Sequence, residues 1–514
     1  MRKVVIIGAG PAGLTAASEL SKAGNSEYSI TVLEESKQVG GISKTVNHNG
    51  NRMDLGGHRF FSKDKNITKW WSDRLAVQSS PAYDDLKLGR AKEYANGNAD
   101  PEKQDDVFLI RDRVSRIYYL KKFFDYPISM KPQTFINMGF SRTAKAGASY
   151  IASCIHKREE TNLENFYINR FGKVLYSMFF EAYTEKLWGR HPSAISADWG
   201  AQRVKGLSVT AIIKDIFSIK GSEKETSLIE RFYYPKYGPG QLWEKVAEEA
   251  ENSGVNIIKN AKAVGINRND GKISSVVYNQ DGETKEIDCD ILISSMPVKD
   301  LVEAMNFDVP SEVKRIAAGL PYRDFVTVGL LVDKLNLKNE TKIKTLSNII
   351  PDCWIYVQEA NVKLGRIQIF NNWSPYLVKD PENTVWIGLE YFCNENDSFW
   401  NMSEDECAKY AIDELASMGI IEKNQKILDF HREKVKKAYP AYFDTYSEIQ
   451  TVIDYIDSLG NLYCIGRNGQ HRYNNMDHSM ATAFEAVKAI TENKADKTAI
   501  WSVNTEKKYH EKAE

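Results

Sequence analysis

Hydrophobic residues at the start of the chain follow the pattern of two buried strands joined by a helix. The first run, Val4 to Ile7, is uninterrupted, as in a strand that is buried on both faces. An Ala- and Leu-rich stretch with helical spacing comes next, and a second run, Ser29 to Leu33, ends in Glu34. The turn after the first run carries glycines in the spacing GxGxxG: Gly8, Gly10 and Gly13. This order of strand, glycine turn, helix, strand and acid favours a dinucleotide-binding unit over an ordinary glycine-rich turn.

Each residue of the motif has an expected task. Gly8 permits the tight turn, Gly10 lets the backbone approach a pyrophosphate, and Gly13 lets the helix and the strand pack closely. The helix N-terminus meets the charge of the pyrophosphate, and Glu34 accepts hydrogen bonds from a ribose. The motif alone does not distinguish NAD from FAD.

Two glycine pairs downstream bear on that choice. Paired glycines mark places where the backbone passes close to something bulky. The first pair is Gly40-Gly41. The second pair is Gly56-Gly57, directly before His58. Two such places beyond the ribose acid favour a long cofactor, and the sequence therefore predicts FAD.

Further along the chain the spacing of apolar residues alternates between helical and strand-like. Helical spacing dominates from residue 134 to about residue 207. Residues 273–287 alternate around Asp281-Gly282, which predicts a β-hairpin. Strand-like runs between residues 325 and 391 predict a second, mostly antiparallel sheet. Residues 84–106 are polar and rich in Gly and Asn, and we expect a mobile loop there.

These patterns predict an α/β protein in which an FAD-binding Rossmann-like domain of the glutathione reductase type is interleaved with two others, a helical domain and a mostly antiparallel β-sheet substrate domain. A second strand–glycine–helix unit, Leu462 to Ile490, indicates that the chain returns to close the cofactor site. The predicted boundaries are 1–80, 226–300 and 430–495 for the FAD-binding domain, 81–225 for a mainly helical substrate or cap domain, 301–429 for the β-sheet domain and 496–514 for a polar tail.

Composition narrows the class of protein. With 68 basic and 69 acidic residues the net charge is −1, which argues against an electrostatic nucleic-acid binder. The six cysteines have no disulfide or zinc-site spacing, so we expect reduced thiols, a cytoplasmic location and no metal site. A strand that begins by Val4 leaves no room for a signal peptide. No run approaches the roughly 18 apolar residues of a spanning helix, although a peripheral membrane contact stays open.

Arginines are the candidates for binding a charged ligand beside the flavin. Four of them stand in aromatic or glycine-rich contexts: Arg203, Arg366, Arg467 and Arg472. The planar guanidinium makes paired hydrogen bonds to phosphate oxygens. Surface salt bridges, for example with Glu185 or Asp198, are the alternative for each of them.

The extended glycine pattern resembles that of a flavoprotein superfamily which includes amine oxidases, protoporphyrinogen oxidase and UDP-galactopyranose mutase. Within it, the layout is most similar to the eukaryotic-type mutases. Segments that resemble mutase motifs are Tyr183 to Gly189, Ala201 to Val204, Cys353 to Tyr356, Gly365 to Phe370, Tyr439-Pro440, Gly466 to Gly469 and Asp477 to Met480. Two stretches depart from that pattern, Arg59-Phe60-Phe61 after His58 and Gly238-Pro239-Gly240, and they leave the sugar and the reaction open.

The resemblance implies a role for each matching residue. Arg203 and Arg366 would clamp a diphosphate, and His58 would tune the flavin, or be a structural histidine. Val264 would lie against the adenine, or be an ordinary core valine. Expected substrate contacts are Tyr126, Trp188, Trp354, Tyr356, Tyr439 and Tyr473; expected further cofactor contacts are Gly466, Arg467, Asp477 and Ser479.

The reaction that the resemblance implies is a redox-neutral interconversion of pyranose and furanose forms of a nucleotide sugar. Reduced FAD acts through its N5 as the nucleophile at the anomeric carbon, and NADPH or NADH could be the reductant. An FAD-dependent oxidoreductase of the amine oxidase or protoporphyrinogen oxidase type is the alternative, because a fold does not determine its chemistry. A flavin-binding scaffold without turnover is a weaker third interpretation. The nucleotide, the sugar and the oligomeric state are left undetermined.

Overall fold

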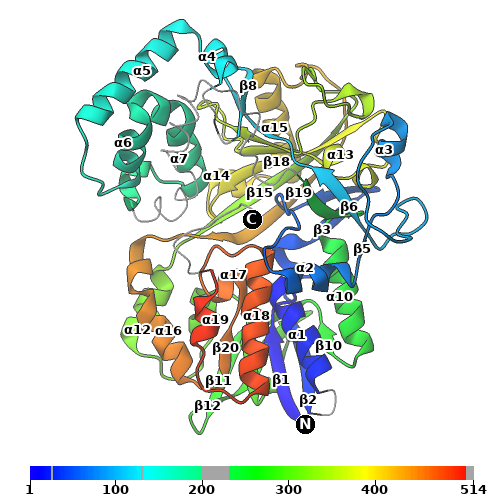
Figure 1. Ribbon diagram of the computed structural model, residues 1–514. Helices are drawn as coiled ribbons and strands as arrows, with labels where there is room; N and C mark the ends of the chain where they lie inside the picture. The colour runs from blue at the N-terminus through cyan, green and yellow to red at the C-terminus, as the bar shows by residue number, and fades with distance from the viewer. Residues whose placement is uncertain (25–26, 127, 129–130, 198–230, 505–514) are drawn as a thin grey trace.

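The GxGxxG unit forms the centre of a five-stranded parallel sheet, seen in the lower half of Figure 1. The computed structural model describes residues 1–24, 27–126, 128, 131–197 and 231–504. The strand order is β10-β2-β1-β14-β20, and every neighbouring pair is parallel. The strands are β1 (Arg2–Ile7), β2 (Tyr28–Leu33), β10 (Asn256–Ile258), β14 (Ile291–Ser294) and β20 (Leu462–Cys464).

Alternate side chains of β1 enter two different cores, as expected where successive residues point to opposite faces. Val4 and Ile6 pack with helices α1 (Pro11–Ala23), α10 (Gly240–Asn252) and α18 (Met476–Thr491). Val5 and Ile7 pack with α11 (Val298–Glu303), α12 (Ser311–Gly319), α16 (Ile449–Ser458) and a three-stranded sheet. That sheet contains β11 (Ala261–Asn269), β12 (Lys272–Gln280) and β13 (Glu283–Asp288), and its β12–β13 pair confirms the predicted hairpin. Both faces of the parallel sheet are therefore covered.

A seven-stranded sheet in the upper half of Figure 1 confirms the predicted second sheet. Its order is β19-β15-β18-β17-β16-β7-β8, antiparallel except for the pair β16 and β7. The strands are β7 (Ser115–Tyr119), β8 (Lys122–Asp125), β15 (Tyr322–Val332), β16 (Trp354–Val357), β17 (Arg366–Ile369), β18 (Val385–Cys393) and β19 (Ile427–Pro440). Helix α15 (Glu404–Met418) packs on one face. Two predicted boundaries fail here, because β7 and β8 come from the stretch 81–225 and β19 crosses residue 430.

Four helices form a layer at one end of this sheet: α4 (Pro132–Met138), α5 (Phe140–Ile155), α6 (Leu163–Tyr176) and α7 (Ala182–Trp188). Gly172 interrupts α6 with φ +78°, and a Cβ there would lie 2.8 Å from the backbone nitrogen of Tyr150. A glycine is therefore needed where α6 crosses α5. Smaller sheets join β3 (Thr45–His48) to β4 (Asn51–Asp54), and β5 (Ala76–Val77) to β6 (Val107–Asp112) and β9 (Arg231–Pro235).

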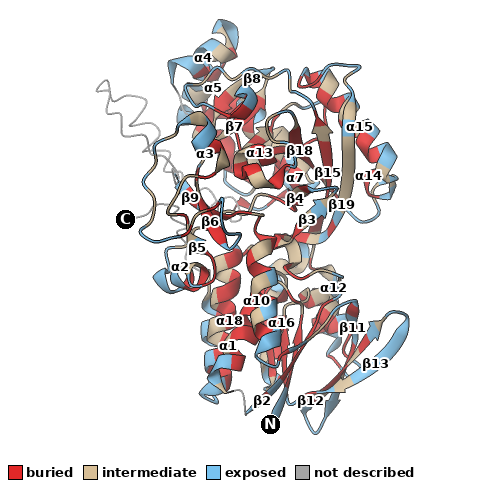
Figure 2. Ribbon diagram, turned by 90° about the vertical axis from the view of Figure 1, so that its right-hand side faces the viewer, coloured by how far each residue is buried: buried red, intermediate tan, exposed pale blue. Residues whose placement is uncertain are grey.

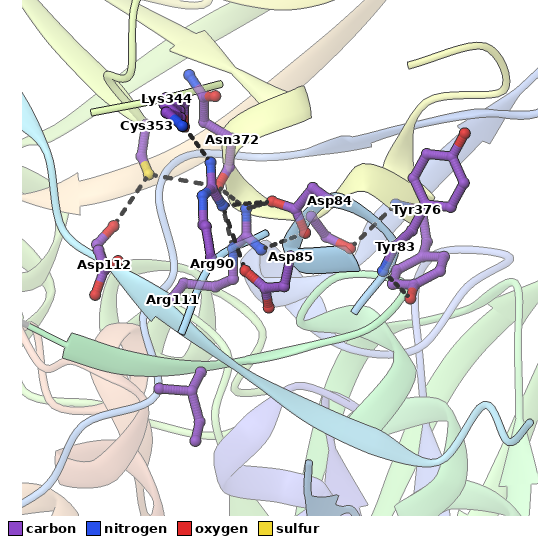
Figure 3. Close-up of polar contacts among 12 residues, drawn as sticks. Tyr83, Asp84, Asp85, Arg90, Arg111, Asp112, Lys344, Cys353, Asn372 and Tyr376 are labelled. Atoms are coloured by element: carbon purple, nitrogen blue, oxygen red, sulfur yellow. Dashed lines mark hydrogen bonds and ion pairs between the residues drawn. The ribbon is translucent and has the colours of Figure 1, made fainter. Parts of the chain in front are cut away.

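Part of the polar stretch 84–106 is anchored, so the expectation of a mobile loop is wrong there. Helix α3 (Tyr83–Leu88) places Asp84 against Arg111 of β6, with two hydrogen bonds of 3.0 and 2.9 Å (Figure 3). Arg90 adds a bond of 2.9 Å to Asp84. Burial alone would raise the pKa of Asp84, but Arg111 and the neighbouring cations lower it to about 2. Polar composition here reflects a buried ion-pair network rather than a solvated loop.

The predicted polar tail is also wrong in part. Helix α19 (Thr498–Ser502) buries Ile500 and Trp501, and the guanidinium of Arg472 donates to the carbonyls of Trp501 and Val503. Five residues with two buried apolar side chains carry too little pattern to be recognised as a packed helix. None of the described helices has the length and apolarity that crossing a membrane requires.

Candidate active site

A cavity of about 1230 Å³ lies between the parallel sheet and the seven-stranded sheet. The carboxyl ends of the parallel strands open into it: Gly8 follows β1, Glu34 follows β2, Ser295 follows β14 and Gly466 follows β20. Ligands of open α/β sheets bind at this edge. The opposite wall carries side chains of β16, β17 and β19.

At the parallel-sheet end, the glycine motif has the geometry that a dinucleotide needs. A Cβ on Gly13 would lie 1.9 Å from the carbonyl oxygen of Gly8, so helix and strand touch as expected. Gly8 has φ +97° and no space toward Ser295. Gly10 faces Gly41, whose Cβ would come within 3.2 Å of the Gly10 Cα. The two backbone turns thus form a narrow floor beneath the cavity.

Glu34 is buried and held by three hydrogen bonds. The backbone N–H of Ala9 donates to Oε2 at 2.7 Å, and the N–H and hydroxyl of Ser36 donate to Oε1 at 2.9 and 2.7 Å. A carboxylate has about four lone-pair sites, so Glu34 retains acceptor capacity toward a ribose. Glu34 lies in the cavity wall, and its binding of a ribose stays a prediction.

Buried polar atoms without partners among the described residues mark where a cofactor would bind. They include Nδ1 of His58, Nε and Nη2 of Arg467 and Oδ1 of Asn468, all from residues in the cavity wall. Burial, followed by the charge of Arg467, lowers the pKa of His58 to about 4. Unpaired buried donors and acceptors cost free energy unless a ligand satisfies them. These unpaired atoms, the glycine floor and Glu34 together make the residues of the cavity suitable for binding FAD.

At the other end of the cavity, Arg366 of β17 is surrounded by aromatic side chains and is 7% exposed. Its Nε donates to the hydroxyl of Tyr183 at 2.6 Å. Its Nη1 donates to Oε2 of Glu390 at 3.1 Å and to the hydroxyl of Tyr439 at 2.9 Å. The guanidinium carbon lies 5.0 Å from the ring centre of Trp354. These contacts fix the guanidinium in one orientation.

Stacked rings form the walls of the aromatic end. Tyr126 and Tyr356 stack with ring centres 4.1 Å apart, and Tyr439 and Tyr473 stack at 5.7 Å. Trp188 meets Tyr439 edge to face at 6.5 Å. Burial raises the pKa of Tyr439 to about 12, so this phenol stays protonated and can donate a hydrogen bond.

The structure brings most of the predicted site residues to this one cavity. Those in its wall are Gly8, Gly10, Glu34, Gly41, Gly56, Gly57, His58, Tyr126, Trp188, Trp354, Tyr356, Arg366, Tyr439, Gly466, Arg467, Tyr473, Asp477 and Ser479. Arg203 lies outside the described residues. Val264 is not among the residues of the cavity wall; it is 36% exposed and lies at a register shift in β11 between Ala263 and Gly265, and its contact with the adenine stays a prediction.

Sequence reasoning missed several residues of the cavity. Tyr183 stands in a segment that resembles a mutase motif, but its contact with Arg366 depends on the packing of α7 beside β18, the neighbour of β17 in the sheet. Glu390 lies within a strand-like run whose apolar pattern hides it. Arg59 and Arg113 line the cavity, and Nη1 of Arg59 is buried with no hydrogen-bond partner among the described residues. The sequence signal for Arg59 was that Arg59-Phe60-Phe61 departs from the mutase pattern.

Comparison with known proteins agrees with this architecture. The chain is similar to reduced UDP-galactopyranose mutase with a TM-score of 0.75 and 19% identity over 100% of both chains. It is similar to a putative protoporphyrinogen oxidase from Exiguobacterium sp. 255-15 with a TM-score of 0.65 and 15% identity over 96% of this chain and 99% of that one. It is also similar to wild-type putrescine oxidase bound to putrescine, with a TM-score of 0.56 and 15% identity over 95% of this chain and 99% of that one. At these identities the likeness shows the fold alone.

Sequence comparison supplies the family. An 80-residue stretch is 40% identical to the L-amino-acid oxidase of Siganus canaliculatus, and it spans 15% of this chain and 14% of that protein. The model of the family described as flavin-containing amine oxidoreductase matches residues 11–481. This match and the geometry of the cavity support FAD as the cofactor. The chain therefore belongs to the family of flavin-containing amine oxidoreductases.

Proposed function

We propose that this protein is an FAD-dependent mutase that interconverts the pyranose and furanose forms of a nucleotide sugar. The observation that carries the proposal is the buried guanidinium of Arg366 at the aromatic end of the FAD cavity. A guanidinium in such a setting suits a diphosphate. The overall likeness to UDP-galactopyranose mutase supports the same substrate class.

The charge of the cavity wall favours an anionic ligand. Its basic side chains are Lys44, Arg59, Arg113, Arg366, Lys434, Lys436, Arg467 and Arg472, whereas its acidic ones are Glu34, Glu35 and Asp477. A protonated amine would meet this excess of positive charge unfavourably, while a nucleoside diphosphate would be attracted. The cavity charge thus argues for a nucleotide sugar over an aliphatic amine.

Two tyrosines would add hydrogen-bond donors beside Arg366. The hydroxyls of Tyr183 and Tyr439 both accept hydrogen bonds from its guanidinium. Their own O–H hydrogens are therefore directed at other acceptors, such as phosphate oxygens. Donors fixed before the substrate arrives stabilise charge that develops on the diphosphate as the bond to the sugar breaks. Arg203 would be the second arginine of the clamp.

When bound in reduced form, FAD supplies a nucleophile for the anomeric carbon. The stacked tyrosines would exclude bulk water from the sugar, and His58, neutral above about pH 5, would contact the flavin without adding charge. NADPH or NADH would provide the initial reduction.

The test is product analysis with the reduced, flavin-loaded protein and a panel of UDP- and dTDP-sugars. Arg366→Ala should be combined with Glu390→Gln, because removing the arginine alone would leave a buried carboxylate unpaired. We expect the double variant, and Arg203→Ala, to retain flavin and lose turnover by about 10²-fold or more. The surface substitution Arg315→Ala is the matched control and should behave as the wild type. Undiminished turnover in both active-site variants would refute the mechanism.

An FAD-dependent amino-acid oxidase is the second candidate. The 40% identity of one stretch to an L-amino-acid oxidase favours it, and Arg366 could bind a substrate carboxylate as well as a phosphate. Hydrogen peroxide formation with an L-amino acid, without conversion of any nucleotide sugar, would replace the mutase proposal with this one.

A further inference from the structure

Helix α5 turns an apolar face toward solvent. Phe140 is 90% exposed, Ile151 is 61% exposed and Ile155 is 69% exposed. The buried positions of α5 are the small residues Ala146 and Ser153, and the helix packs against α6. Amphipathic helices of globular proteins normally point their apolar stripe at the core. Here the arrangement is reversed.

The exposed apolar residues of α5 form one stripe. Phe140, Ala144, Ala148, Ile151 and Ile155 follow a spacing of three or four residues, which places them on the same side of a helix. All five are exposed, and exposed positions of α4 and α5 are pale blue in Figure 2. Ile136 of α4 is also 65% exposed. We call these six residues the α4–α5 face; exposed apolar groups gathered in this way mark interaction sites.

The segment that carries this face is strongly basic. Residues 126–158 contain five Lys and Arg residues and no Asp or Glu, although Asp125 before them pairs with Lys131 at 3.2 Å and the exposed Glu159 and Glu160 follow them. The five cations are exposed: Lys131, Arg142, Lys145, Lys157 and Arg158. Lys145 lies on α5 beside the apolar stripe, and Lys157 and Arg158 follow the end of the helix. A partner that suits this face must therefore offer both apolar groups and negative charge.

A second copy of the chain fits this face poorly. In a twofold interface the same patch meets itself, so Arg142 and Lys145 on α5 of one copy would face the same two cations of the other, and α5 itself carries no acid. An anionic lipid surface fits both features, because apolar side chains insert at the headgroup level and cations contact the lipid charges. We propose that the α4–α5 face binds the surface of membranes that contain anionic lipids.

The position of the two helices agrees with this role. They lie at an extremity of the molecule, at the upper left of Figure 1, away from the parallel sheet. The 16 residues of α5 span about 24 Å, enough for the helix to rest along a membrane plane. The protein would bind at the membrane surface. None of the described helices is long and apolar enough to span a bilayer.

Vesicle flotation with the full-length, flavin-loaded protein tests the proposal independently of any catalytic activity. Vesicles of phosphatidylcholine with 30% phosphatidylglycerol are compared with phosphatidylcholine alone, at low salt and in 0.5 M NaCl. The test variant is Phe140→Ser with Ile151→Ser, and Leu86→Ser, at a residue of α3 that is 57% exposed, is the matched apolar control. Lys145→Glu is compared with Lys314→Glu, an exposed lysine of α12.

We expect binding to the anionic vesicles only, weakened by salt. The double serine variant and Lys145→Glu should each reduce the bound fraction by about tenfold or more, while Leu86→Ser and Lys314→Glu bind as the wild type does. Flavin content and the thermal midpoint should stay at wild-type values, because the substituted residues are exposed. Absence of binding to anionic vesicles, or undiminished binding of the double variant, would overturn the proposal. A lipid-free dimer that the double variant dissociates would overturn it too, by assigning the face to a second copy.

Discussion

Gly57 lies directly against the indole ring of Trp354: a Cβ at this glycine would come within 1.7 Å of Cζ3 and 2.0 Å of Cε3. The glycine belongs to the second glycine pair, and Trp354 belongs to β16 in the seven-stranded sheet. The two walls of the cavity therefore meet at this contact. Arg366 stands over the same indole ring, so the position of its guanidinium depends on the absence of a side chain at residue 57.

We predict that Gly57→Ala displaces Trp354 and lowers the free energy of unfolding by about 1–3 kcal/mol, the usual cost of overpacking. Urea unfolding followed by tryptophan fluorescence measures the change, and flavin absorbance per protein reports the effect on the cavity. Gly147→Ala is the matched control, because a Cβ there has no atom within 4 Å and its helical position favours alanine. Equal unfolding free energies for Gly57→Ala and the wild type would contradict the prediction.

Asp54 gives the stability a pH dependence. It is fully buried at the end of β4, accepts a hydrogen bond of 2.8 Å from the hydroxyl of Thr45, and accepts another from the hydroxyl of Tyr234. Burial raises the pKa of Asp54 to about 7, despite these two bonds. Between about pH 4 and pH 7 the folded protein therefore holds a proton that the unfolded chain releases, so this group makes stability fall as the pH rises.

We predict that Asp54→Asn removes this contribution. The free energy of unfolding of the variant relative to the wild type should increase from pH 4 to pH 7, by up to about 4 kcal/mol, and stay constant above pH 7. Urea titrations at a series of pH values measure the difference. A difference that does not change with pH would show that Asp54 does not titrate in this window.

His58 should stay neutral wherever the protein is active. Its pKa is lowered to about 4 by burial and, second, by Arg467. We predict no titration of the His58 ring between pH 5.5 and pH 8 in NMR spectra of the oxidised, ¹⁵N-histidine-labelled protein, assigned by comparison with His58→Gln. The pH profiles of kcat/KM should have the same shape in the wild type and the variant over this range. An inflection near pH 6.5 that disappears in His58→Gln would disprove this.

Helix α19, close to the end of the chain, should contribute to stability. Lys497 donates to the carbonyl of Leu462 at 2.8 Å, and the indole N–H of Trp501 donates to Asp457 at 3.0 Å. Truncation after Lys494 should lower the free energy of unfolding by about 3 kcal/mol or more, since a buried Trp alone contributes that much. The full-length protein is the reference for this comparison. Equal stability of the truncated and full-length proteins would contradict the prediction.

Local patterns in the sequence predicted the parts of the fold whose contacts are local. The GxGxxG turn, its flanking strands and Glu34 interact within one continuous segment, and the structure shows Gly13 packed on Gly8 as expected. The hairpin around Asp281-Gly282 depends on turn residues that need positive φ, and it was predicted for the same reason. The resemblance added many of the residues that line the cavity.

Tertiary structure alone decided which side chains meet. The partners of Arg366 come from α7, β18 and β19, and the strand-like pattern around Glu390 gives no sign that its carboxylate is buried there. Asp84 belongs to the polar stretch that predicted a mobile loop, and only the folded chain brings it to Arg111 of β6. The apolar stripe of α5 reads as core, but in the structure its opposite, small-residue side packs on α6. Hydrophobic periodicity shows that a helix has an apolar face, whereas the burial of that face depends on contacts between segments distant in the sequence.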